Sequence, residues 1–158
     1  MRGGVAIAFL ALVGCAPADG ADSGSGTGER VPFAQAAMTV HRDPNCGCCE
    51  AWAEIASKAG YKVTVVQHDD MGAVKQRLGV PADLASCHTV EVGGYVLEGH
   101  VPMDQVERLL REKPGDIAGI AVPGMPLGSP GMEVPDGTVD DYQVIAFDRA
   151  GNARLYRA

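Results

Sequence analysis

Along the first half of the chain, the spacing of apolar residues alternates between that typical of a strand and that typical of a helix. Short runs of apolar and β-branched residues favour strands. Elsewhere apolar residues recur at i, i+3, i+4 and i+7, which places them on one face of a helix, as Trp52, Ile55, Ala56 and Ala59 do. The pattern predicts, in order, a strand at 38–41, a helix at 48–59, a strand at 62–66 and a helix at 71–78.

The next segment carries a strong hairpin signal. Gly93-Gly94 separates two short apolar runs, 89–92 and 95–98, and a two-residue glycine turn is typical of a β-hairpin. Pro102 is suited to a first helical position, and apolar residues then recur at helical spacing up to Lys113. The complete order, βαβαββα, is that of the thioredoxin-like fold. We therefore predict an α/β thioredoxin-like domain over residues 38–114.

Residues 115–158 differ in character from the rest. Residues 123–137 hold four prolines and four glycines, and a loop of this length is usually functional or disordered. The apolar runs at 142–147 and 153–156 flank a turn and predict a terminal β-hairpin that adds to the sheet or covers its edge. We expect a C-terminal extension over 115–158, a loop plus β-hairpin that contributes metal ligands.

The N-terminal residues have the features of a processing signal. Arg2 precedes a short apolar run that is too short to span a bilayer. Leu12-Val13-Gly14-Cys15 resembles the bacterial lipobox, in which cleavage before the cysteine leaves it lipid-modified. An ordinary secretory signal is the alternative. We expect a lipoprotein signal peptide over 1–14, a lipidated Cys15 with a flexible tether over 15–37, and a bacterial envelope location facing the periplasm.

Charge excludes one class of partner. The net charge is −7 and the pI is about 4.9. Nucleic-acid binding rests on cationic contacts to phosphate, so we expect no nucleic-acid partner. The length remaining after signal removal suits one domain, and we expect a monomer.

Cys46-Gly47-Cys48-Cys49 combines two kinds of chemistry. Cys46 and Cys49 have the C-x-x-C spacing of redox dithiols at a helix N-terminus, where the dipole favours the Cys46 thiolate and Cys49 is the resolving thiol. If a disulfide forms here, the 46–49 pairing is expected, because a vicinal 48–49 bridge is strained. Dithiol chemistry does not need Cys48. A third thiol favours a soft metal.

A second group of side chains is expected at the same place. Cys87 and His88 follow the second predicted helix, at the junction where thioredoxins carry a cis-proline against the C-x-x-C, and this chain has no proline there. His100 ends a predicted strand at the same edge. Met125 and Met132 lie in the Pro/Gly loop, and their neutral thioethers suit Cu(I) better than Zn(II). We interpret His41 and His68 as ordinary surface or strand-end histidines.

Four sequence blocks together resemble the CopG copper-resistance family. They are Cys46-Gly47-Cys48-Cys49, Cys87-His88-Thr89, Gly99-His100-Val101-Pro102 and the segment from Gly124-Met125-Pro126 to Gly131-Met132. The resemblance covers about residues 38–157. It implies an exported thioredoxin-like protein with a C-terminal extension and a redox role in copper detoxification. Carried over, it implies copper ligation by Cys46, Cys48, Cys49, Cys87, Met125 and Met132, and His88 and His100 also fit the blocks.

These features support one leading hypothesis and several alternatives. The leading hypothesis is an envelope copper-binding protein that holds more than one Cu(I), meets copper efflux or copper chaperone proteins, and acts in storage or as a copper-linked oxidoreductase. A thiol–disulfide oxidoreductase working through Cys46 and Cys49 is the first alternative. An iron–sulfur protein is the second, since four cysteines suffice for a two-iron cluster. Structural zinc fits poorly, because the ligands lie closer together than the usual spacing.

Overall fold

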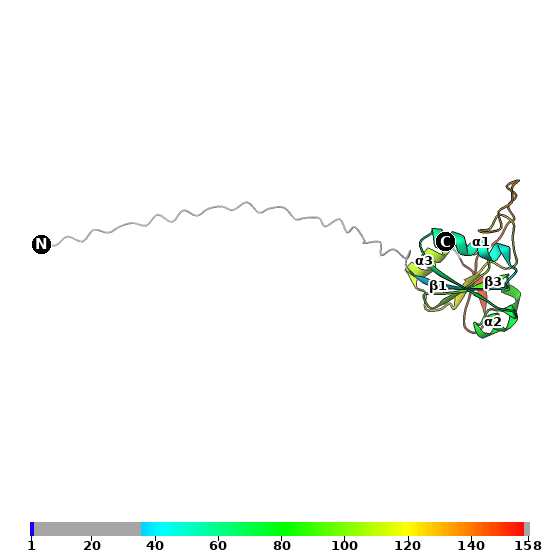
Figure 1. Cartoon of the computed structure of the whole chain (residues 1–158). Coiled ribbons are helices and arrows are strands. Elements are labelled where there is room, and N and C mark those ends of the chain that lie inside the picture. Colours follow the sequence, from blue (N-terminus) through cyan, green and yellow to red (C-terminus); the bar gives the residue numbers. More distant parts are fainter. Residues whose placement is uncertain (2–35, 157–158) are drawn as a thin grey trace. The chain divides into compact units, whose positions relative to one another are not determined.

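The computed structural model describes Met1 and residues 36–156 (Figure 1). The predicted signal peptide, the lipidated Cys15 and nearly all of the tether lie outside the described residues. The described part contains one mixed sheet of seven strands in the order β2-β1-β3-β4-β5-β6-β7. Its strands are β1 (Ala37–Arg42), β2 (Lys62–Gln67), β3 (His88–Val92), β4 (Tyr95–Glu98), β5 (Gly119–Ala121), β6 (Ile145–Phe147) and β7 (Ala153–Leu155).

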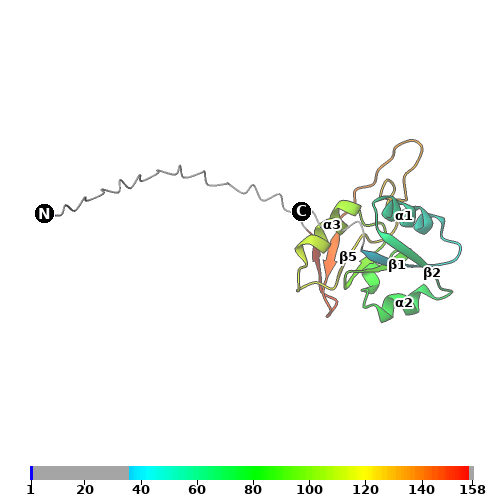
Figure 2. The ribbon, with the colours of Figure 1, turned by 60° about the vertical axis from the view of Figure 1, so that its left-hand side comes forward.

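Three α-helices cover the sheet in the described part of the chain. They are α1 (Gly47–Lys58), α2 (Met71–Arg77) and α3 (Met103–Glu112), and a 3-10 turn, η2 (Ala82–Leu84), precedes β3. Helices α1 and α3 lie over one face, and α2 lies over the other (Figures 1 and 2). The main core, which includes Trp52 from α1, Val40 from β1 and Leu109 from α3, is fully buried under α1 and α3.

The face toward α2 is polar over β1 and β3, in contrast to this core. Successive strand residues point to opposite faces, so the buried Met38 and Val40 alternate with Thr39 and His41. His41 pairs with Thr89, and Thr89 pairs with Glu98 across the next ladder. Polar side chains from three strands therefore share one face of the sheet.

Apart from η2, the first seven helices and strands follow the expected βαβαββα order. The predicted hairpin is confirmed, because Val92 pairs with Tyr95 across Gly93 and Gly94. Both glycines have positive φ angles, 57° and 85°, which a two-residue turn of this kind requires. Pro102 differs from the expectation. It is the residue before α3 rather than its first helical residue, since its ψ of 143° is extended.

The C-terminal extension contains more of the sheet than predicted. The predicted hairpin forms from β6 and β7, but the unpredicted strand β5 joins it to β4, pairing parallel with β4 and antiparallel with β6. The strand predicted at 142–147 is shorter, because its partner β5 ends at Ala121, which pairs with Ile145. The loop between Val122 and Val144 is thus fastened to the sheet at both ends.

Among the described residues, none of the helices has the length and apolar character needed to cross a membrane.

Candidate metal centre

The C-x-C-C motif begins α1. Cys46 is the residue before the helix, and a disulfide joins it to Cys49 one turn later, which is the expected pairing. The turn before it is held from β1, where the buried Arg42 guanidinium donates hydrogen bonds to the carbonyl oxygens of Asp43 (3.1 Å) and Pro44 (3.0 Å). The first turn of α1 is therefore fixed to the end of a central strand.

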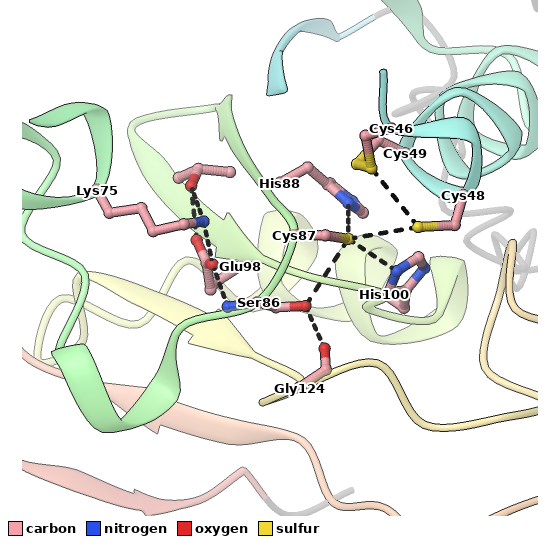
Figure 3. A network of polar contacts seen from close by, with 11 residues as sticks. Cys46, Cys48, Cys49, Lys75, Ser86, Cys87, His88, Glu98, His100 and Gly124 are labelled. Carbon is pink, nitrogen blue, oxygen red and sulfur yellow. Dashed lines mark hydrogen bonds and ion pairs between the residues drawn. A yellow bond between two sulfur atoms is a disulfide. The ribbon is translucent and has the colours of Figure 1, made fainter. Parts of the chain in front are cut away.

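Cys48 connects the disulfide to a distant part of the chain. Its Sγ lies 3.6 Å from Cys46 Sγ and 3.8 Å from Cys87 Sγ (Figure 3). Cys48 and Cys87 are both free thiols. Cys48, the thiol that dithiol chemistry does not need, thus lies between the Cys46–Cys49 disulfide and Cys87.

Cys87 has an imidazole on either side. Its Sγ lies 3.2 Å from His88 Nδ1 and 3.0 Å from His100 Nε2 (Figure 3). His100 Nδ1 lies 2.8 Å from the carbonyl oxygen of Pro130. Because a carbonyl only accepts, Nδ1 carries the proton and Nε2 presents a lone pair toward the sulfur. A backbone acceptor that fixes the tautomer in this way is the usual arrangement for a metal-binding histidine.

His88 is completely buried, and its Nε2 has no hydrogen-bond partner among the described residues. Its ring centroid lies 5.0 Å from those of both Trp52 and His100, and it meets His100 edge-on at 88°. Burial lowers the pKa of His88 well below its ordinary value, and the nearby His100 and Lys75 lower it further. Burial also lowers the pKa of His100. Both rings are therefore neutral at neutral pH, the form in which imidazole binds metals.

The Cys87 thiol is protonated when no metal is present. Burial raises its pKa to about 12, and the neighbouring Cys48 adds to the effect. A thiophilic metal at this position must displace the proton, so metal binding here releases acid.

A buried ion pair positions the segment that carries Cys87. Glu98 has no exposed surface, and its Oε1 accepts hydrogen bonds from the Ser86 backbone N–H (2.6 Å) and from Lys75 Nζ (2.5 Å). The Thr89 hydroxyl donates to Oε2 at 2.6 Å. Burial raises the pKa of Glu98, and these three donors oppose the rise. Ser86 and Thr89 flank Cys87-His88, so one carboxylate fixes both ends of that dipeptide.

The Pro/Gly loop lies against the same cluster. The Ser86 hydroxyl donates to the Gly124 carbonyl oxygen, and the two residues form a parallel bridge. A Cβ at Gly131, whose φ is +84°, would lie 2.9 Å from the Trp52 backbone nitrogen and 3.0 Å from the Cys48 carbonyl oxygen. Only glycine therefore allows the loop to approach the first turn of α1 this closely.

The two loop methionines lie differently. Met125 is 55% exposed and lines an open hollow of about 1050 Å³ with Pro123, Pro126 and Tyr142. Met132 is half-buried and directly follows Gly131. Their role as ligands stays a prediction, which the backbone position of the loop supports for Met132 more than for Met125.

The structure brings most of the predicted site residues together. The ligand atoms of Cys46, Cys48, Cys49 and Cys87 all lie within 4.8 Å of one another, and so do those of Cys87, His88 and His100. Sequence reasoning missed Lys75, Glu98 and Gly131. Gly131 had a local signal in the sequence, because glycines recur within the Pro/Gly loop. The ion pair of Lys75 with Glu98 had no local signal.

The comparisons with known proteins point to copper. Two solved structures described as copper resistance protein CopG, form 2 and form 1, share 48% and 49% sequence identity with this chain, with TM-scores of 0.72 and 0.70. They cover 77% and 75% of this chain, and 95% and 93% of their own lengths. Residues 84–132 match a family model described as a protein of unknown function, DUF411. The search of curated proteins found no match.

Proposed function

This chain belongs to the CopG copper-resistance family, and on that premise we propose that it binds copper as Cu(I) on cysteine thiolates. The observation that carries the proposal is the position of Cys48, whose sulfur lies within 4 Å of both Cys46 and Cys87. Thiolates select soft ions such as Cu(I). Four thiols within 4.8 Å of one another exceed what a single two- or three-coordinate Cu(I) needs, so we expect more than one copper per chain.

Nitrogen donors extend the proposed site. His100 Nε2 presents a lone pair toward the Cys87 sulfur, and the neutral His88 lies on its other side. Met125 and Met132 complete the proposed ligand set with soft thioethers from the loop. Copper is the cargo of such a site rather than a resident cofactor.

Redox control follows from the disulfide. Two electrons and two protons convert the Cys46–Cys49 disulfide into two thiols, and a cellular dithiol is the class of reductant that supplies them. Reduction then makes four thiols available to copper, and oxidation removes two of them. We propose that this exchange couples copper binding to redox state, as in a copper-linked oxidoreductase.

The proposed setting is the bacterial cell envelope. We propose that Cys15 carries the lipid anchor and that residues 38–114 form a thioredoxin-like domain facing the periplasm. The sheet order β2-β1-β3-β4, with β1 parallel to β2 and antiparallel to β3, supports the assignment of the domain. Copper efflux or copper chaperone proteins are the proposed partners of a monomer.

Metal analysis tests the proposal. The reduced full chain, purified without oxygen and loaded with Cu(I), should hold more than one copper, and the oxidised protein should hold less. Cys48→Ser should lower the copper count and affinity. Cys15→Ser is the matched control, since it replaces the cysteine that the lipobox assigns to the anchor and not to the proposed ligand set. A Cys48→Ser variant that binds as much copper as the parent, equally tightly, would refute the role of the central thiol.

Thiol–disulfide exchange on proteins is the second candidate, because the Cys46–Cys49 disulfide stands at the start of α1. Ser86 and Cys87 occupy the place of the proline that shapes a peptide groove in thioredoxins, which weighs against it. Turnover of a disulfide substrate by metal-free protein, abolished by Cys46→Ser, would support it. Iron content and the absorption spectrum test the iron–sulfur alternative.

A further inference from the structure

A second cluster, of two imidazoles and a carboxylate, lies on the face of the sheet opposite the thiols. His41, near the end of β1, places its Nδ1 2.9 Å from Nε2 of His68, which follows β2. Its other nitrogen, Nε2, lies 2.8 Å from Oε1 of Glu91 in β3. Three neighbouring strands thus bring two imidazoles and a carboxylate together, although the sequence suggested ordinary histidines.

For two neutral imidazoles beside an ionised Glu91, the hydrogen bonds define the tautomers. An ionised carboxylate only accepts, so His41 Nε2–H donates to Glu91 and His41 Nδ1 bears a lone pair. His68 Nε2–H then donates to that lone pair. His41 is 5% exposed and is held by Glu91, whereas His68 is half-buried and its ring is tilted 42° from that of His41. One imidazole is therefore fixed, and the other is accessible from solvent.

The cluster is separate from the thiol centre. His41 and Arg42 are consecutive strand residues and point to opposite faces of the sheet. Arg42 holds the turn that carries Cys46, whereas His41 shares the α2 face with Thr89 and Glu91. A metal bound between His41 and His68 would therefore not share ligands with the cysteines.

We propose that His41 and His68 form a second metal site, one for Cu(II), with Glu91 orienting His41. Two nitrogens at cis positions of a tetragonal ion, with metal–nitrogen bonds of about 2.0–2.1 Å, lie about 2.9 Å apart. The two nitrogens are 2.9 Å apart already. Tetrahedral ligands would lie about 3.3 Å apart, so a tetragonal ion needs a smaller change in the separation of the two nitrogens than Zn(II) does.

Metal binding rearranges His68 and leaves His41 in place. The metal replaces the hydrogen bond between the two rings and lies beside the line that joins their nitrogens, because two metal–nitrogen bonds do not fit end to end within 2.9 Å. The His68 ring therefore swings aside, and its proton moves from Nε2 to Nδ1. The Glu91 carboxylate lies behind His41, which is the carboxylate–histidine–metal arrangement that fixes the ligating tautomer. Water completes the coordination. Imidazoles without thiols do not reduce Cu(II), so this site would hold the oxidation state that the thiol centre does not favour.

Cu(II) titration followed by electron paramagnetic resonance tests the proposal. The background is the oxidised full chain carrying Cys15→Ser, Cys48→Ser and Cys87→Ser, in which the disulfide occupies the two remaining cysteines, so that no free thiol is left. We expect one Cu(II) with hyperfine splitting from two nitrogens. His68→Gln should weaken binding more than about tenfold and remove one nitrogen, and Glu91→Leu should weaken it by about 10–100-fold.

Gln67→Ala is the matched control, because Gln67 neighbours His68 but its side chain points to the other face. It should leave the spectrum and affinity unchanged. His68 carries the test because it is half-buried and its replacement leaves the core intact. Unchanged Cu(II) affinity in His68→Gln would overturn the proposal. Because the thiols are absent from this background, that failure would leave Cu(I) binding at the cysteines unaffected.

Discussion

Cys48 and Cys87 are 39 positions apart in the sequence, yet their sulfur atoms lie 3.8 Å apart. The sheet explains the approach, because β3 pairs antiparallel with β1 so that His88 lies opposite Arg42, where the chain turns into α1. The pair therefore exists only in the folded protein. Its bridging position between the disulfide and the two histidines makes it the centre of the proposed copper site.

Cys87→Ser should weaken Cu(I) binding by at least about tenfold, because it removes the one sulfur that contacts Cys48, His88 and His100 together. Competition with a chromophoric Cu(I) chelator measures the affinity. Ser57→Ala is a suitable control, since Ser57 is an exposed residue in the last turn of α1, at the opposite end of the helix from the cysteines. Equal copper affinity in Cys87→Ser and the parent would contradict the ligand assignment.

Glu98→Gln should destabilise the fold and weaken copper binding together. It leaves the Lys75 ammonium without its buried counter-charge, and breaking such a pair costs about 3–5 kcal/mol. Adding Lys75→Met should recover part of the stability, since the glutamine oxygen still accepts from the Ser86 N–H. Urea unfolding measures the free energy, and chelator competition measures copper affinity. If Glu98→Gln lost stability but kept its copper affinity, the pair would not position Cys87.

Gly131→Ala should weaken copper binding, whereas Gly137→Ala should not. Both glycines have positive φ angles, +84° and +74°, so each substitution carries a backbone strain of about 1–2 kcal/mol. Only the Gly131 methyl group meets α1, because nothing lies within 4 Å of a Cβ at Gly137. Thermal unfolding and copper titration of the two variants separate strain from the loss of loop contact. Equal copper affinities in Gly131→Ala and Gly137→Ala would show that the loop does not contribute to the copper site.

The sequence predicts the helices, the strands and the proposed ligands better than it predicts the contacts that hold those ligands in place. The cysteines and His100 could be placed together because each lies at the end of a helix or strand, and the order of these elements could be predicted from the sequence. Strand β5 could not, because three residues are too short to display an alternating pattern. The Lys75–Glu98 pair joins α2 to β4, and no local spacing indicates such a contact.

The pairing of His41 with His68 was hidden for the same reason. It depends on the parallel register of β1 and β2, in which His41 lies beside Val66, two residues before His68. Glu91 reaches His41 only through the antiparallel ladder to β3. The strands could be predicted from the sequence, but the register between strands joined by a long connection could not.

Tyr61→Phe should make the protein more resistant to alkali. The Tyr61 hydroxyl is buried, with no hydrogen-bond partner in the described part of the chain, and burial followed by the charge of Glu107 raises its pKa to about 12. The unfolded chain loses this proton near pH 10, so the stability of the parent falls as pH rises from 10 to 12. The contribution is about 1 kcal/mol at pH 11.

Urea unfolding of both proteins at pH 9 and pH 11 isolates this contribution, because all other titrating groups are common to the two. The free-energy difference between Tyr61→Phe and the parent should shift in favour of the variant at pH 11. An identical difference at the two pH values would contradict the assignment to Tyr61.

X-ray absorption at the copper edge tests the central claim most directly. The reduced full chain loaded with Cu(I) should show a Cu(I) edge and a first shell dominated by sulfur, with a scattering contribution from a second copper. The sulfur contribution should fall in Cys48→Ser and stay unchanged in Cys15→Ser. A first shell of nitrogen and oxygen alone, or a sulfur shell indifferent to Cys48→Ser, would contradict copper binding at the cysteine cluster.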